Sequence, residues 1–278
     1  MRRMAAREAI ASFLHAALDF LLPRQCIVCG RYLGLQEKHL CLHCQADLPF
    51  TRNWLMKHNP MADQFNALLE QMRPSPPYEE EISPRGPLGL GRDDKGEAGL
   101  GRDDKTHEPY ANAAALLFYR GDSPYSRIPQ ALKYGGNIAA GRYFAGMLGA
   151  AMAQQPHWQD VDTVIPVPLH WRRKHARGYN QAEIIAEELA KALGATLYPN
   201  ALKRVRRTKS QTSLKAEDRL KNVSGVFAVN RLPDSPRHVL LVDDTFTTGA
   251  TLATCYEAVR SVIGPSTHIS VATLSAVY

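Results

Sequence analysis

Residues 238–251, HVLLVDDTFTTGAT, constrain the fold of this 278-residue chain more than any other segment. The aliphatic run 239–242 is typical of a strand in a parallel sheet that helices cover on both faces. Two carboxylates, Asp243 and Asp244, follow the run, and a loop of threonines with one glycine then leads into an apolar helical pattern. The sequence therefore predicts a strand–loop–helix unit of an α/β fold. Its polar residues lie at the carboxyl end of the strand, where open α/β sheets bind ligands.

The residue types in this loop suit a phosphorylated sugar. Unpaired backbone N–H groups at a helix N-terminus attract an anion, and threonine hydroxyls add donors. The two carboxylates would repel a phosphate, so we expect them to bind a vicinal diol or a hydrated Mg²⁺. The chain has no Walker A sequence, and no GxGxxG follows a predicted strand. A buried strand that merely ends in a polar turn is the simpler alternative, but it does not explain the whole pattern.

The segment resembles the phosphoribosyl pyrophosphate (PRPP) motif of type I phosphoribosyltransferases. The resemblance implies that Asp243 and Asp244 hold the ribose hydroxyls, with Mg²⁺ bound together with PRPP. It also implies a set of residues that wrap the 5′-phosphate. These are Thr245, Thr247, Thr248, Gly249, Ala250 and Thr251.

Four of the five cysteines form two CxxC pairs, Cys26/Cys29 and Cys41/Cys44. Two such pairs supply the four thiolates of a closed, structural zinc site. Two disulfides are the main alternative, and His39 or His43 could each replace a cysteine as ligand. The fifth cysteine, Cys255, falls on an apolar helix face, and we expect it to be a buried thiol.

Composition and the first residues define the broad class. The chain is 45% hydrophobic, enough for a sizeable core, and its net charge of +7 favours anionic ligands without separating nucleic acid from polyphosphate. The N-terminal segment begins with arginines, but Glu8, His15 and Asp19 interrupt its apolar run. It therefore predicts an amphipathic helix rather than a signal peptide. We expect a cytoplasmic protein without membrane insertion.

Three regions follow along the chain. Residues 1–56 carry the N-terminal helix and a small four-cysteine, zinc-ribbon-like module. Residues 57–110 are predicted to be a flexible linker or insertion, because a stretch rich in Pro, Gly and charge repeats GLGRDDK at 89–95 and 99–105 and offers no apolar face. Residues 111–278 alternate apolar runs with helical patterns, which predicts a parallel sheet flanked by helices. Strands are expected at 113–119, 161–167, 226–229, 239–242 and 269–274.

Three segments of this third region together resemble the ComF/GntX family, whose members are linked to DNA uptake and utilisation. They are IPVPLHWRRKHARGYNQAE, RTKSQTSLKAEDRLKNVSGVF and the Asp-Asp loop, in that order. The resemblance covers roughly residues 26–49 and 111–278. It implies an α/β fold with a type I phosphoribosyltransferase-like parallel sheet and an N-terminal zinc module. Some members carry a second cysteine set before the α/β domain, and this chain has the linker there, so one zinc is implied.

The resemblance also assigns roles to other loops. Lys133, Tyr134, Gly135 and Gly136 resemble a pyrophosphate loop, although the same glycines would also suit a helix C-cap. Arg177 could bind phosphate bidentately. Further binding residues are implied after the second strand and in a mobile loop over the site, for which a solvated basic surface is the alternative. They are Asn180, Gln181, Arg207 and Gln211. Asn180 and Glu183 also have the spacing of a capping box.

These assignments imply displacement of pyrophosphate from PRPP. Lys133, Arg177, Asp243 and Asp244 are the expected catalytic residues, and the acceptor stays unassigned. The alternative is a non-catalytic adaptor that binds PRPP or a nucleotide and contacts single-stranded DNA or a DNA-uptake helicase.

Overall fold

The structure is a computed structural model that describes residues 23–73, 109–169, 174–175, 177–205 and 226–277. Its centre is a five-stranded sheet in the order β1-β7-β6-β2-β3, in which every neighbouring pair is parallel. A small antiparallel pair, β4 with β5, stands apart from it. The strands are β1 (Ala113–Phe118), β2 (Thr163–Pro166), β3 (Thr196–Leu197), β4 (Leu202–Arg204), β5 (Phe227–Val229), β6 (His238–Phe246) and β7 (His268–Ala276).

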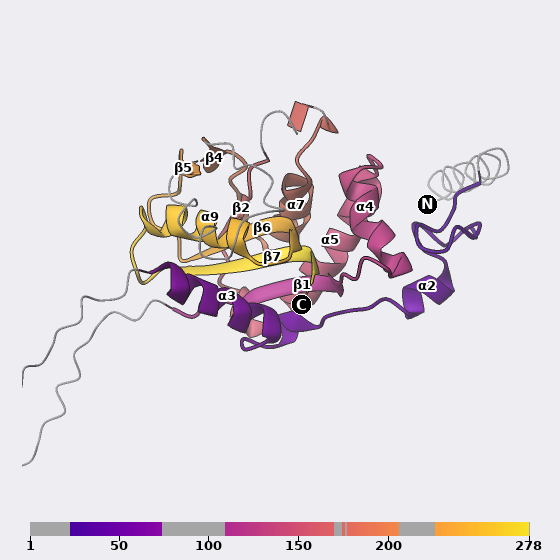
Figure 1. The fold of residues 1–278 in the computed structure, drawn as a ribbon, viewed down its shortest axis with the longest axis horizontal. Coiled ribbons are helices and arrows are strands. Elements are labelled where there is room, and N and C mark those ends of the chain that lie inside the picture. Colours follow the sequence, from indigo (N-terminus) through magenta and orange to yellow (C-terminus); the bar gives the residue numbers. More distant parts are fainter. Residues whose placement is uncertain (1–22, 74–108, 170–173, 176, 206–225, 278) are drawn as a thin grey trace, which may run out of the picture.

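Helices cover both faces of the sheet (Figure 1). Alternate strand residues point to opposite faces, so Leu240 packs in one buried cluster and Leu241 in the other. The first cluster includes residues of α4, α5 and α7, and the second includes residues of α3 and α9. The α-helices are α2 (Leu42–Ala46), α3 (Pro60–Met72), α4 (Arg127–Lys133), α5 (Ile138–Ala153), α7 (Gln181–Leu193) and α9 (Ala250–Arg260), with 3-10 turns η1 (Asn53–Leu55), η2 (Pro124–Ser126) and η3 (Pro156–Trp158).

The predicted fold class, a parallel α/β sheet flanked by helices with a four-cysteine module, is confirmed. The expected strands at 113–119, 161–167, 226–229, 239–242 and 269–274 correspond to β1, β2, β5, β6 and β7. β6 is longer than predicted, because Asp243 to Phe246 continue to pair with β7. The helix expected before residue 23 lies outside the described residues.

The predicted linker 57–110 needs a correction at its beginning, where the structure has α3. Asn59 caps this helix by accepting hydrogen bonds from two backbone N–H groups, and Pro60 starts its first turn. Met61 and Phe65 are fully buried, and the Phe65 ring packs edge-on against Phe246 and Tyr256. Residues 57–72 therefore belong to the folded body, and the tandem repeat lies outside the described residues.

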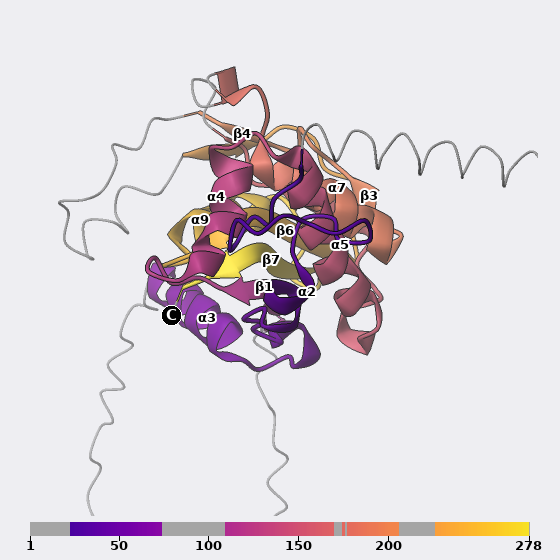
Figure 2. The ribbon, with the colours of Figure 1, turned by 90° about the vertical axis from the view of Figure 1, so that its right-hand side faces the viewer.

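The cysteine-bearing segment packs on the same body (Figure 2). Phe50 forms a β-bridge with Leu117 of β1, and Trp158 donates an indole hydrogen bond to the carbonyl of Trp54. The module and the sheet thus share one buried cluster, which includes Cys26, Cys41 and Cys44. No helix in the described part of the chain has the length and apolar character needed to cross a bilayer.

Candidate functional site

A cleft of about 380 Å³ lies at the carboxyl ends of β2 and β6. It arises because β2 ends at Pro166, opposite Val242, while β6 continues for four more residues that pair only with β7. The edge of β6 on the β2 side is thereby unpaired from Asp243 onward, and the side chains of Asp243, Asp244 and Thr245 are partly exposed. The lining comprises Lys133, Tyr134, Val167, Pro168, Leu169, Arg177, Asn180, Gln181, Ala182, Arg204, Asp243, Asp244, Thr245, Thr247 and Thr251. The cleft thus brings together ten predicted site residues from three separate segments.

The acidic pair lies on the floor of this cleft. Asp244 forms an ion pair with Lys133 at 3.1 Å, and Lys133 also donates a hydrogen bond of 2.9 Å to Thr245 Oγ1. Asp243 accepts a 2.8 Å hydrogen bond from the backbone N–H of Asp244. Burial, and then repulsion by the Asp244 carboxylate, raise the pKa of Asp243 to about 7. Lys133 and Arg204, which both line the cleft, attract the charge of Asp243 and offset only part of this shift.

The threonine loop ends in the N-terminus of α9. Gly249 has φ +76°, and a Cβ on it would lie 2.8 Å from the Phe246 ring, so this turn requires glycine. The first N–H groups of α9 have no partner within the helix, and Thr247 and Thr251 line the cleft beside them. Thr248, Gly249 and Ala250 form the turn but do not line the cleft.

Arg177 lines the same cleft as the acidic pair. Its guanidinium lies 5.3 Å from the centre of the exposed Tyr134 ring and donates a 3.0 Å hydrogen bond to Gln181 Oε1. The Nε2 of Gln181 is buried and has no hydrogen-bond partner among the described residues. A buried amide donor without an acceptor is costly, and in a ligand cleft it indicates an acceptor that a ligand supplies.

Asn180 has a structural use in addition to its place in the lining. Its side chain caps α7 by accepting from the N–H of Ala182, and its Nδ2 donates to the Val167 carbonyl at the end of β2. The predicted cap is therefore present. Glu183, however, pairs with Lys174 at 3.4 Å.

The glycines of the loop after α4 have the geometry of a helix C-cap and do not line the cleft. Gly135 donates a backbone hydrogen bond to the Ala131 carbonyl, and Gly136 has φ +62°, as in a helix C-terminal turn. The same turn directs Lys133 and Tyr134 into the cleft. Arg207 and Gln211 lie outside the described residues.

Sequence reasoning did not single out the apolar wall of the cleft, formed by Val167, Pro168, Leu169 and Ala182. The available signal was the position of Val167 and Pro168 just after a buried strand.

A larger hollow, of about 760 Å³, is bordered by the loops before β6 and β7. Its described cation, Arg237, is already paired with Asp162 at 3.2 Å.

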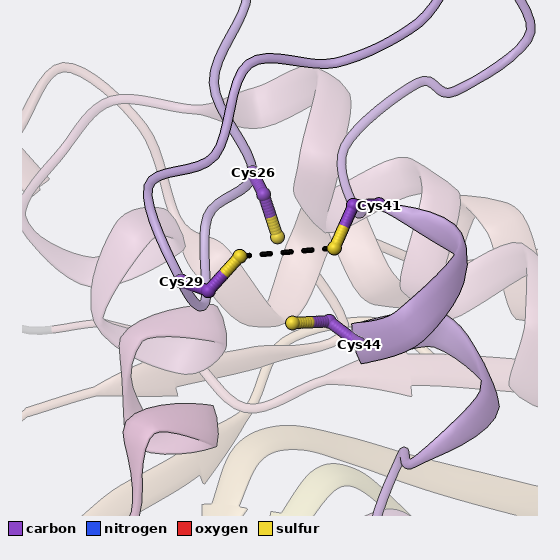
Figure 3. A group of neighbouring side chains, drawn as sticks. All are labelled: Cys26, Cys29, Cys41 and Cys44. Atoms are coloured by element: carbon purple, nitrogen blue, oxygen red, sulfur yellow. Dashed lines mark hydrogen bonds between the residues drawn. The ribbon is translucent and has the colours of Figure 1, made fainter.

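The four cysteines of the CxxC pairs converge on one point (Figure 3). All four sulfur atoms lie within 4.8 Å of one another, and Cys29 Sγ is 3.7 Å from Cys41 Sγ. A tetrahedral zinc ion with Zn–S bonds of about 2.3 Å would place its sulfurs about 3.8 Å apart. A disulfide requires about 2.05 Å. The geometry therefore fits zinc and not two disulfides.

Without a metal ion the thiols of the cluster ionise unequally, because burial and hydrogen bonds to the other three cysteines raise the pKa of Cys44. Burial opposes ionisation of Cys26, but hydrogen bonds from the backbone N–H groups of Cys29, Cys41 and Val28 lower its pKa to about 7. His39 and His43 are not part of the cluster, and the His39 ring packs 5.2 Å from Tyr143. Cys255 is buried in α9, where desolvation raises its pKa, as expected for an inert thiol.

Comparisons with known proteins agree with both parts of the chain. Residues 17–54 match the family described as the double zinc ribbon domain. Competence protein F of Haemophilus influenzae is 37% identical over 134 residues, which cover 46% of this chain and 58% of that protein. The resemblance to the ComF/GntX family is confirmed.

Two further ComF/GntX-like relatives are DNA utilization proteins YhgH. The protein of Escherichia coli K12 is 38% identical over 93 residues, and that of Salmonella typhi is 38% identical over 92; each match covers 33% of this chain and 40% of the relative. The chain therefore matches less than two thirds of the length of these relatives. Although the matched zinc family is double, the chain has five cysteines and Cys255 lies in α9, so one four-cysteine cluster is formed.

Proposed function

We propose that the cleft binds PRPP together with Mg²⁺ and that the protein acts in DNA uptake or utilisation. The observation that carries this proposal is the convergence, in one cleft, of the acidic pair, the cations Lys133 and Arg177, and the threonine loop at the start of α9. A ligand that fits must carry hydroxyls or a metal ion for the acidic pair, a phosphate for the threonine loop, and further phosphate for Lys133 and Arg177. The names of the relatives, competence protein F and DNA utilization protein YhgH, support the cellular role.

The acidic pair provides the donor set that Mg²⁺ prefers. Carboxylate oxygens of Asp243 and Asp244 would hold the ion through water or directly, and bound Mg²⁺ would supply charge to the phosphate oxygens. A divalent ion beside the pair would also favour ionisation of Asp243, which is otherwise opposed by burial and by Asp244. The residues present therefore fit the group.

In the proposed reaction, the bond between the anomeric carbon and pyrophosphate breaks, and a bond to an acceptor forms. Negative charge develops on the leaving pyrophosphate, and Lys133 and Arg177 stabilise it electrostatically. Lys133 is held 3.1 Å from Asp244, so its ammonium is already oriented in the cleft when the ligand arrives. No histidine is present in the described lining, and the acceptor and its general base stay unassigned.

The test is a calorimetric titration of PRPP with Mg²⁺ into wild type and into Asp243→Asn/Asp244→Asn. We expect at least about a tenfold loss of affinity in the variant, the effect typical of lost metal contacts. The matched control is Asp122→Asn/Asp234→Asn, which removes two exposed carboxylates and leaves the cleft intact. Because both variants become more positive by the same amount, a loss confined to the first cannot come from net charge. Equal affinity in the two variants would refute the proposed site.

A second candidate is an adaptor that binds the ligand without transferring it and contacts single-stranded DNA. The net charge of +7 and the names of the relatives favour it. Pyrophosphate release is measured over a panel of bases and amines, and ligand binding without release supports the adaptor. Single-stranded DNA binding with a steep salt dependence that survives the Asp243→Asn/Asp244→Asn change would assign DNA binding to basic surfaces outside the cleft.

A further inference from the structure

The short helix α4 connects the zinc module with the cleft. Its first residue, Arg127, faces the cysteine-bearing segment, and its last residue, Lys133, is in the cleft. Figures 1 and 2 both show the cysteine-bearing segment beside α4. The two sites are thus the two ends of one seven-residue helix.

The two segments that carry the CxxC pairs are each hydrogen-bonded to the chain at or just before the start of this helix. Arg127 Nη1 donates a 2.9 Å hydrogen bond to the carbonyl of Val28, which lies between Cys26 and Cys29. The Tyr125 hydroxyl, just before α4, donates a 2.9 Å hydrogen bond to Asp47, the residue that ends α2. Because α2 carries Cys44, both halves of the metal site hold the same short stretch of chain.

The other end of α4 is fixed to the cleft. Lys133 contacts Asp244 and Thr245, and the Leu132 carbonyl accepts a hydrogen bond from the Tyr179 hydroxyl. Leu132 is also buried against Gly141 of α5. A displacement at Arg127 would therefore reach the ammonium of Lys133 through one rigid element.

A seven-residue helix has no stability of its own in water, so its position depends on the groups that hold its ends. Zinc joins the two CxxC pairs by bonds to all four sulfurs. Without the ion, Val28 and Asp47 would be held relative to each other only by weaker links, such as the hydrogen bond from the Ile27 N–H to the His39 carbonyl. The acceptors that hold Arg127 and Tyr125 would then be less firmly placed relative to each other.

We propose that the zinc module is a positioning element for the pyrophosphate side of the cleft, and that Tyr125 and Arg127 are the positioning residues that transmit its order through α4 to Lys133. The structural coupling is independent of the ligand, whereas its effect on ligand affinity rests on the proposed function. The module would then do more than stabilise its own fold.

The test is the variant Tyr125→Phe/Arg127→Met, which removes both hydrogen bonds and keeps most of the apolar surface. The control is Tyr119→Phe/Arg120→Met, because neither side chain makes a hydrogen bond in the described part of the chain. Three quantities are measured: zinc content, amide hydrogen exchange of segment 127–136 compared with α9, and affinity for PRPP with Mg²⁺.

We expect the first variant to retain its zinc and to exchange about tenfold faster in segment 127–136, as for the loss of one or two hydrogen bonds, with α9 unchanged. Arg127→Lys, which keeps a donor, should restore part of the protection. Removing zinc from wild type with a chelator should accelerate the same segment. Unchanged exchange in segment 127–136, or an equal rise in α9, would overturn the proposal.

The affinity measurement separates the two proposals. If wild type binds PRPP, the first variant should bind several-fold more weakly than the control. If wild type does not bind PRPP, the proposed function fails, while the exchange measurement still decides whether the zinc module positions α4.

Discussion

Replacing Asp243 by Asn should stabilise the protein at alkaline pH. The fold raises the pKa of this carboxyl from 3.8 to about 7, first by burial and then through the charge of Asp244. The folded protein therefore binds the Asp243 proton more tightly than the unfolded chain does. Stability must then fall as pH rises from about 4 to about 7, because ionisation is easier in the unfolded state. Asn cannot ionise, and its amide oxygen can still accept the N–H of Asp244.

The size of the effect follows from the shift of about three units. At 1.36 kcal/mol per unit, the ionised carboxylate costs the folded state at most about 4 kcal/mol above pH 8. The shift already includes the attraction of Lys133 and Arg204, but Asp243 is partly exposed, so screening by solvent reduces the cost to about 1–2 kcal/mol. For a protein of this size, that gain raises the melting temperature by roughly 2–6 °C.

The assay is urea and thermal unfolding of wild type and Asp243→Asn at several pH values without Mg²⁺. We expect the variants to differ most at pH 8 and to converge towards pH 4, where Asp243 becomes protonated in the unfolded chain as well as in the folded protein. Asp122→Asn, which changes an exposed carboxyl, should show no such pH dependence. If Asp243→Asn is no more stable than wild type at pH 8, or is equally stabilised at pH 4, the electrostatic reasoning fails.

Three further predictions concern the turn, the sheet and the metal. Gly249→Ala should cost about 1–3 kcal/mol of unfolding free energy, because alanine would have to adopt φ +76° and its Cβ would press against the Phe246 ring. The control Gly146→Ala, in α5 with no atom within 4 Å of its added Cβ, should be neutral or stabilising, and equal urea midpoints of the two variants would contradict this. Burial lowers the pKa of His238, so the folded state favours the neutral ring, and the contribution of this side chain to unfolding free energy should decline as pH falls below 6.5, opposite to that of Asp243; the difference between wild type and His238→Gln should therefore shift in favour of the variant over this range, and a constant difference would refute it. Metal analysis should find one zinc per chain, and a chelator should make four more thiols reactive; thiols that react equally before and after chelation would exclude the site.

Local patterns determined what could be predicted of the site. The apolar run before Asp243, the single glycine in the threonine loop and the CxxC spacing are each contained within a few residues. Their structures follow from backbone geometry and ligand chemistry. The pairing of Lys133 with Asp244 could not be predicted, because it joins segments more than a hundred residues apart through the strand order of the sheet.

The helix α3 was missed although its signals are present. Asn59 and Pro60 form a typical helix start, and Met61 and Phe65 recur at the spacing of one helix face. Because the stretch that follows is rich in Pro and Gly, all of residues 57–110 were predicted to be a linker. The short strands β3 and β4 gave no periodic signal, since two or three residues cannot show alternation.

The charges of the cleft show why the ligand should carry both a cation and phosphates. Lys133 lines the cleft together with the acidic pair, where its ammonium pairs with Asp244, and Arg204 also attracts the charge of Asp243. Phosphate alone would be attracted by Lys133 and Arg177 but repelled by the acidic pair. Mg²⁺ alone would be attracted by the acidic pair but repelled by the two cations. A Lys133→Met variant should therefore bind Mg²⁺ more tightly in the absence of phosphates and PRPP with Mg²⁺ more weakly, because the ammonium repels the ion and attracts pyrophosphate. Calorimetry with each ligand measures both changes, and a change of the same sign in both would show that Lys133 does not separate the two charges.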